Sequence, residues 1–162
     1  MNKQRQTHPI PPLYDDHSRV LILGSFPSVL SREQGFFYGH PRNRFWCVLS
    51  TVLGVPEPKS VPEKREMLLQ NGIALWDVIA SCEIHGSADS TITDVVPNDL
   101  TPLFDRCADL RVFTNGRTAD AYYRRYQLPL CGREAVCLPS TSPANAAWNV
   151  QKLCEAWRQI TD

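Results

Sequence analysis

The sequence lacks the cysteine and histidine spacings by which proteins hold a structural metal ion or an iron–sulfur cluster. It contains six cysteines, but no two of them have CxxC spacing. Such a site needs several ligands that the chain places close together. We therefore expect no metal and no cofactor. We also expect free, mostly buried thiols at Cys47, Cys82, Cys107, Cys131, Cys137 and Cys154.

Long apolar runs and an excess of charge of either sign are also absent. No segment approaches the roughly 20 apolar residues of a membrane-spanning helix, and residues 1–9 lack the apolar stretch of a secretory signal. We therefore expect a soluble, cytoplasmic protein with no membrane partner. Seventeen basic residues balance 17 acidic residues, which disfavours tight, non-specific binding of nucleic acid by a strong overall field.

The composition is that of a globular protein. Of the 162 residues, 43% are hydrophobic and 21% are charged, close to the averages for folded domains. The length suits one domain. We expect this domain to span residues 1–162, with residues 1–18 as an N-terminal extension.

Short apolar runs alternate with helical patterns along the chain. Continuous runs at 20–23, 73–76, 111–114 and 135–138 predict strands that are buried on both faces. Apolar residues at helical spacing predict helices over 44–53, 62–71, 98–108, 118–126 and 144–160. This order predicts an α/β fold with a parallel sheet.

Ligands of such sheets bind beyond the carboxyl ends of the strands, so the residues that follow each strand are of interest. Gly24–Ser28 (GSFPS) is either a plain turn or a place where the backbone approaches a ligand. Asp77, after the second strand, either caps a helix or contacts a ligand. Asn115, before Gly116, is either a turn residue or an amide that binds one edge of a base.

The segment Gly35–Trp46 (GFFYGHPRNRFW) contains three successive aromatic residues, a histidine, an asparagine and two arginines. Aromatic side chains in a loop can stack on a base, arginines can contact phosphates, and an asparagine can hold a water or cap the helix that follows. Core packing is the alternative for the phenylalanines and Trp46. The candidates are Tyr38, His40, Arg42, Asn43 and Arg44.

The fourth strand is followed by Leu138–Asn145 (LPSTSPAN), a run of hydroxyl side chains at the expected start of the last helix. Free N–H groups at a helix start, together with hydroxyls, can bind a phosphate. Ordinary capping by Ser142 before Pro143 is the alternative, and both roles can hold together.

Taken together, these segments resemble the uracil-DNA glycosylase superfamily. The turn GSFPS resembles its first motif, FYGHPRNRFW resembles the stretch that follows in the mismatch-type enzymes, and STSP resembles the second motif, which grips the DNA backbone. The resemblance extends from Arg19 to Trp157. It implies a three-layer αβα sandwich with a central four-stranded parallel sheet.

One departure points to a branch of the superfamily. Phe26 stands where the uracil enzymes usually have an Asp or Asn that positions the attacking water, and phenylalanine cannot orient water. The hypoxanthine-DNA glycosylases share this pattern, and the sequence resembles them most. This resemblance implies that Asn43 has the catalytic role and that Asn115 takes part. Ser28 replaces a glycine found in many relatives.

The implied function is to flip a deaminated base, chiefly hypoxanthine, out of DNA and to hydrolyse its N-glycosidic bond, leaving an abasic site. No lysine occupies an evident nucleophile position, so we expect a monofunctional enzyme, and we expect a monomer with damaged DNA as its partner. The catalytic candidates are Asn43 and Asn115. The base-binding candidates are Phe26, Phe37, Tyr38, His40 and Asp77. The DNA-backbone candidates are Ser25, Arg42, Ser140, Thr141, Ser142 and Asn145.

Three alternatives stay open on the sequence. The same fold could remove uracil or mismatched thymine, although Phe26 argues against it. The chain could be a catalytically inactive DNA-binding module. It could also be a small-molecule α/β enzyme, which ranks last because the first strand end lacks the glycines of a GxGxxG motif or a P-loop.

Overall fold

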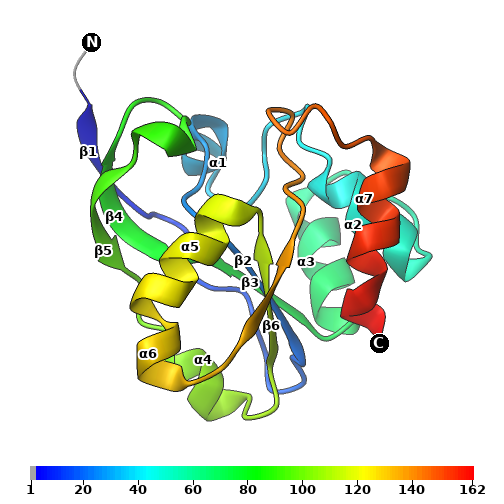
Figure 1. The fold of residues 1–162 in the computed structure, drawn as a ribbon. Helices are drawn as coiled ribbons and strands as arrows, with labels where there is room; N and C mark the ends of the chain where they lie inside the picture. The colour runs from blue at the N-terminus through cyan, green and yellow to red at the C-terminus, as the bar shows by residue number, and fades with distance from the viewer. Residues whose placement is uncertain (1–2) are drawn as a thin grey trace.

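A parallel four-stranded sheet forms the centre of the computed structural model, which describes residues 3–162 (Figure 1). Its strands lie in the order β3-β2-β6-β7. They are β2 (Val20–Gly24), β3 (Ile73–Asp77), β6 (Arg111–Asn115) and β7 (Ala135–Leu138). The four apolar runs of the sequence therefore form the expected strands, and all three pairings between them are parallel. The expected burial on both faces is wrong for β7, because this strand lies at the edge of the sheet and Val136 and Cys137 are exposed.

Helices cover both faces of this sheet, which confirms the three-layer αβα architecture. Side chains alternate along β2: Val20 and Ile22 join one core, and Leu21 and Leu23 join the other. The first core is completed by α2 (Phe45–Leu53), α3 (Val61–Gln70) and α7 (Val150–Trp157). The second core is completed by α4 (Thr101–Arg106), α5 (Arg117–Tyr126) and α6 (Leu128–Cys131).

A second, antiparallel sheet in the order β1-β4-β5 adjoins the first. It consists of β1 (Gln4–Thr7), β4 (Ile79–Ile84) and β5 (Thr93–Pro97), and the short helix η1 (Asp89–Thr91) lies between β4 and β5. The short helix α1 (Val29–Gln34) follows β2 in the chain and hydrogen-bonds to the loop after β4. Only Val78 separates β3 from β4. A third hydrophobic cluster, which contains Phe26 and Ile79, packs against this sheet. The sequence pattern missed all three strands, because β1 is polar and β5 carries little apolar alternation.

The segment that we expected to be an N-terminal extension takes part in both sheets. β1 pairs with β4 from Gln4↔Ile84 to Thr7↔Ser81. Leu13 forms a bridge with Leu75 of β3, and Ile10 and Leu13 are buried in the first core. This segment therefore helps to build the part of the molecule next to the ends of β2 and β3.

Two helices are shorter than the sequence predicts. The last helix was expected over 144–160, but α7 begins at Val150 and continues as η2 (Arg158–Thr161). Its N-cap is Asn149, whose side chain accepts a hydrogen bond from the Lys152 amide, so Ser142 does not cap it. The helix expected over 98–108 is α4, which covers only Thr101–Arg106. Asn98 lies before this helix, and its side chain donates to the carbonyl oxygens of Asp77 and Ile79.

No helix within residues 3–162 is long and apolar enough to cross a membrane. Across the same residues, no group of three or more His, Cys, Asp or Glu side chains is placed to hold a metal ion. All six cysteines are free thiols, of which Cys82, Cys107 and Cys154 are buried and Cys137 is exposed.

Candidate active site

The carboxyl ends of the four parallel strands meet at one edge of the central sheet. The strand register places Gly24 beside Asp77 and Asn115 beside Leu138. Two loops that are far apart in the sequence cover this edge, the one before α2 and the one before α7 (Figure 1, cyan and orange). The Thr141 hydroxyl, which donates to Asn43 Oδ1 over 2.9 Å, connects them.

A chain of hydrogen bonds connects the two asparagines that the sequence singled out. Asn115 Nδ2 donates to Thr141 Oγ1 over 3.0 Å, and the Thr141 amide donates to Asn115 Oδ1 over 3.1 Å. The Phe45 amide donates to Asn43 Oδ1 over 2.9 Å. Because this atom accepts from a backbone N–H and from a hydroxyl, it is the oxygen of the amide. Both of its lone pairs are used, and Asn43 Nδ2 makes no hydrogen bond to the part of the chain that the structure describes.

Arg44 holds the loop before α7 in place. Its guanidinium donates to the carbonyl oxygens of Trp148, Ser142 (2.7 Å) and Asn145 (3.1 Å), and Nε donates to Thr141 O over 3.3 Å. The structure therefore gives no support to the expectation that Arg44 contacts phosphate, since its donors point into the protein. The neighbouring Arg42 is exposed and stays a candidate for the DNA backbone.

Tyr38 places an unpaired hydroxyl at the strand ends. Its backbone is in the left-handed region (φ 51°), and its ring stacks on Phe45 at 4.0 Å between centroids. The hydroxyl is buried and makes no hydrogen bond within residues 3–162. Burial, reinforced by the nearby Asp77 carboxylate, raises the pKa of this hydroxyl far above its usual value. The group is therefore a neutral hydrogen-bond donor at physiological pH.

Gly24 makes room for this hydroxyl and for the Asp77 carboxylate. A Cβ atom on Gly24 would lie 2.3 Å from Asp77 Oδ1 and 3.0 Å from the Tyr38 hydroxyl. Any side chain here would displace both polar groups. The glycine at the end of β2 is thus needed for the close approach of an acceptor at the end of β3 and a donor from the loop before α2.

Asp77 is buried, and its other carboxylate oxygen binds a residue that sequence reasoning missed. His8 Nε2 lies 2.7 Å from Asp77 Oδ2, and the two side chains are 2% and 5% exposed. Since His8 is in the N-terminal segment and follows no strand of the parallel sheet, its position in the sequence did not indicate a role in the site. Only the antiparallel pairing of β1 with β4 brings it to the site.

The other predicted base-binding residues differ in their access to a ligand. Phe37 is 2% exposed and packs in the first core, so it is a core residue and does not offer a free face for stacking. Phe26 is 8% exposed, with the Arg32 guanidinium 5.3 Å above its ring. His40 is half-buried, and its Nδ1 accepts from the Arg42 amide.

Two of the predicted DNA-backbone residues are engaged inside the protein. Thr141 is fully buried, and its hydroxyl serves the two asparagines. Ser25 is also buried and donates to the Asp89 carboxylate over 3.0 and 3.1 Å. The structure gives these two assignments no support, because both hydroxyls already have partners within the protein, and they stay predictions. Ser140, Ser142 and Asn145 are half-buried and form turns within their loop, so they stay candidates.

The Asp89 carboxylate, at the start of η1 and facing the buried Ser25 hydroxyl, gives the site a group whose pKa is raised. Burial of the carboxylate, reinforced by the charge of Asp77 and opposed by the Ser25 hydrogen bond, raises its pKa from 3.8 to about 6. Between these two values the folded protein keeps a proton that the unfolded chain has released. The contribution of Asp89 to stability is therefore lost as the pH rises from about 4 to about 6.

We expect Asp89→Asn to be more stable than the parent protein at pH 7.5, with a difference that disappears near pH 4. The amide avoids burial of a charge and still offers an oxygen to the Ser25 hydroxyl. Urea unfolding at the two pH values measures the difference. A gain in stability of the same size at both would show that the pKa of Asp89 is not raised.

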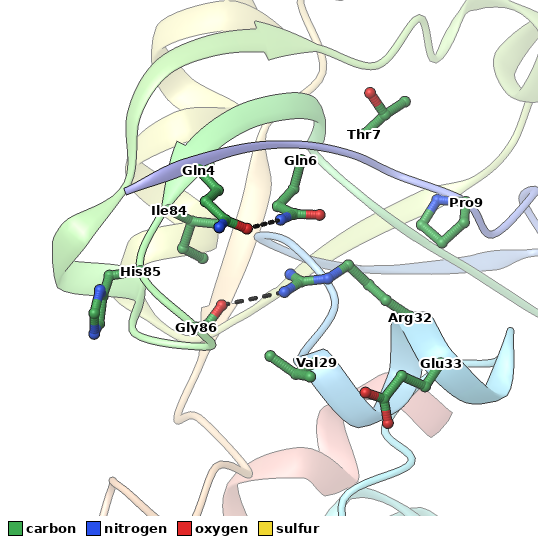
Figure 2. Close-up of a pocket in the computed structure, with 10 residues that line it drawn as sticks. All are labelled: Gln4, Gln6, Thr7, Pro9, Val29, Arg32, Glu33, Ile84, His85 and Gly86. Atoms are coloured by element: carbon green, nitrogen blue, oxygen red, sulfur yellow. Dashed lines mark hydrogen bonds between the residues drawn. The ribbon is translucent and has the colours of Figure 1, made fainter. Parts of the chain in front are cut away.

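An open pocket of about 620 Å³ lies elsewhere, between β1, α1 and the loop after β4 (Figure 2). Arg32 extends across it and donates to the carbonyl oxygens of Pro27 and Gly86. None of the residues that line this pocket belongs to the predicted site. The free donor and acceptor groups are at the strand ends, and we therefore place the candidate active site there.

Comparison with known proteins identifies the family of the chain. The uracil DNA glycosylase superfamily matches residues 11–161. A hypoxanthine DNA glycosylase of Methanosarcina acetivorans is 35% identical over 152 residues, 93% of this chain and 94% of that protein. The enzyme of the same name from Methanosarcina barkeri is 34% identical over 137 residues, 83% of this chain and 85% of that protein.

A solved structure extends the similarity to the whole fold. The solution NMR structure of a candidate uracil DNA glycosylase from Methanosarcina acetivorans superposes with a TM-score of 0.80. It is 31% identical, and the superposition covers 98% of this chain and 100% of that one. The strand-end motifs, the three-layer fold and these matches agree with one another. The chain belongs to the uracil DNA glycosylase superfamily.

Proposed function

We propose that this protein is a monofunctional DNA glycosylase that removes hypoxanthine from deoxyinosine in DNA. The observation that carries the proposal is the pair of groups above Gly24: the Tyr38 hydroxyl, a donor with no hydrogen-bond partner within residues 3–162, and Asp77 Oδ1 as acceptor. The names of the two Methanosarcina relatives support the same substrate. A base must leave the helix to reach these groups, because the strand ends cannot enter the base stack.

The two groups match the edge that deamination creates. Hypoxanthine presents a carbonyl oxygen at C6 and an N–H at N1, so the Tyr38 hydroxyl can donate to the first and Asp77 can accept from the second. Adenine presents an amino group and an unprotonated N1 at these places, and a carboxylate would face that lone pair without a proton between them. With adenine one polar contact stays unpaired, and the arrangement therefore favours the deaminated base over adenine.

Asn43 is placed to assist the chemical step with its free amide N–H groups. In hydrolysis the bond between C1′ and the base nitrogen breaks, its electron pair goes to the base, and water oxygen forms the new bond to C1′. The water loses one proton to solvent and the departing base takes up one proton, so the products are an abasic sugar and the free neutral base. The transition state resembles an oxocarbenium ion. An amide is a poor base, so Asn43 would act by positioning the water and by donating to developing negative charge. Asn115 and Thr141 would keep Asn43 in place.

Residues around the site would contact the DNA backbone. Arg42 is exposed beside Asn43, and Ser140, Ser142 and Asn145 lie on the loop that Arg44 holds. Their amide and hydroxyl groups suit phosphate oxygens, and these contacts would position the duplex without selecting its sequence.

A single-turnover assay tests the function. Labelled duplexes that contain one deoxyinosine, one deoxyuridine or only normal bases are incubated with excess enzyme, and alkali then cleaves at abasic sites. We expect rapid cleavage at deoxyinosine and none at adenine. Uracil also presents an N–H beside a carbonyl oxygen, and the related NMR structure is of a candidate uracil enzyme. Faster cleavage at uracil would move the assignment to that substrate, and no cleavage of any duplex would overturn the proposal.

Tyr38→Phe is expected to lower the rate of hypoxanthine excision by about 10-fold, the effect of one lost hydrogen bond to the base. The same change removes a buried hydroxyl that has no partner, so thermal stability is expected to stay equal or to rise by about 1 kcal/mol. Excision kinetics and differential scanning calorimetry measure the two effects. Unchanged kinetics would show that the base does not reach this hydroxyl.

A further inference from the structure

The N-terminal segment places the imidazole of His8 beside the carboxylate of Asp77, which we propose to bind the base. The His8 amide donates to Ala80 O over 2.7 Å, which extends the pairing of β1 with β4. Two residues on, the Trp76 indole donates to Ile10 O over 2.9 Å. The backbone of this segment is therefore fixed on both sides of the imidazole, which lies between the two sheets.

The His8 ring is enclosed by aromatic side chains. Its centroid is 5.9 Å from Phe26, 6.2 Å from Trp76 and 6.3 Å from Phe37, with the rings of Phe26 and Trp76 nearly perpendicular to it. A side chain that is 2% exposed among these rings has little freedom to rotate. This packing determines the direction in which Nε2 points.

The hydrogen bonds of His8 determine which nitrogen carries the proton. Nδ1 accepts from the Ile10 amide over 3.1 Å, so it carries no hydrogen. The proton is therefore on Nε2, and Nε2 donates to Asp77 Oδ2 over 2.7 Å. The imidazole is neutral in this arrangement. It satisfies one carboxylate oxygen without cancelling its charge, and Oδ1 is left as an anionic acceptor above Gly24.

We propose that His8 is a positioning residue for base selection: its Nε2–H holds Asp77 so that Oδ1 accepts the N1–H of the flipped hypoxanthine. This inference rests on the proposed function and adds a residue from outside the parallel sheet. In residues 3–162, His8 is the one hydrogen-bond partner of the Asp77 side chain. Without it no hydrogen bond fixes which oxygen of the carboxylate faces the base.

Two substitutions separate the hydrogen bond from the packing. His8→Phe keeps an aromatic ring among Phe26, Phe37 and Trp76 but removes the donor, and we expect single-turnover excision of hypoxanthine to fall by about 10- to 100-fold. His8→Gln places an amide N–H near the position of Nε2, and we expect it to recover most of the lost rate. A His8→Phe variant as fast as the parent, or a His8→Gln variant as slow as His8→Phe, would overturn the inference.

A double-mutant cycle tests whether His8 acts through Asp77. If it does, the double variant His8→Phe/Asp77→Asn excises hypoxanthine no more slowly than Asp77→Asn alone, because the positioned group is already gone. A purely structural role of His8 would instead multiply the two losses, and that result would overturn the inference.

The tautomer provides a readout that does not depend on activity. Long-range ¹H–¹⁵N NMR of the imidazole at pH 7.5 is expected to show a proton on Nε2 and none on Nδ1. A proton on Nδ1 would overturn the inference whatever the substrate is. If the parent protein cleaves no duplex, the proposed function fails, and the NMR spectrum still decides on the geometry of the His8–Asp77 pair.

Discussion

Replacing Asn43 with alanine is expected to lower the single-turnover rate of hypoxanthine excision by about 10²- to 10³-fold, or about 3 to 4 kcal/mol in transition-state stabilisation. The reason is the free Nδ2 group, since both lone pairs of Oδ1 already accept hydrogen bonds from Phe45 and Thr141. The rate is measured with enzyme in excess over a deoxyinosine duplex, so that product release does not obscure the chemical step.

Two controls separate the chemistry of Asn43 from its structural role. Asp99 Oδ1 accepts from the Thr101 amide over 3.0 Å, the same two-residue spacing as in the Asn43 contact with Phe45, at the start of α4. Asp99→Ala measures how much stability is lost with such a contact away from the site, and we expect this variant to keep full activity. Asn43→Asp keeps both accepted hydrogen bonds and loses the donor, so we expect a folded, slow enzyme. Parent-like activity of Asn43→Asp would contradict a donor role.

Arg44→Lys is expected to destabilise the protein by about 3 kcal/mol or more. A lysine ammonium cannot match the planar guanidinium that donates to three carbonyl oxygens through Nη1 and Nη2, and each hydrogen bond from a charged donor contributes about 1.5 to 3 kcal/mol. For a chain of this length the change corresponds to a fall in Tm of about 6 to 12 °C. Thermal unfolding followed by circular dichroism measures it.

Arg42→Lys is the matched control for this prediction. Arg42 is exposed, and its side chain makes no hydrogen bond within residues 3–162, so we expect stability to change by less than about 0.5 kcal/mol. A charge is conserved in both variants, which removes net charge as an explanation. Equal stability of the two variants would show that Arg44 does not hold the loop before α7.

The sequence was sufficient for the central layer of the fold. Each of the four runs formed a strand of the parallel sheet, and a short, mainly apolar run is typical of a strand in a sheet that helices cover on both faces. It also placed Asp77 and Asn115 correctly at one edge, because the carboxyl ends of parallel strands meet there.

Prediction failed where tertiary contacts outweigh local pattern. The start of the last helix was placed at Ala144, but the carbonyl oxygens of Ser142, Asn145 and Trp148 face Arg44, which is about 100 positions away in the chain, and α7 begins only at Val150. The strand β1 was missed because its polar sequence QRQT pairs through its backbone with β4, and backbone pairing leaves no apolar pattern to read.

By itself, the sequence determined the sheet, the superfamily and the set of polar residues at the strand ends. The tertiary structure decided which of these groups are free to act. Thr141, Ser25 and Arg44 are polar in the sequence, yet their hydrogen-bonding groups are used within the protein. The Tyr38 hydroxyl is left unpaired, and His8 reaches Asp77 from a different sheet. The physical reason is that a hydrogen-bonding group can serve a ligand only if no partner inside the fold already uses it, and those partners come from distant parts of the chain.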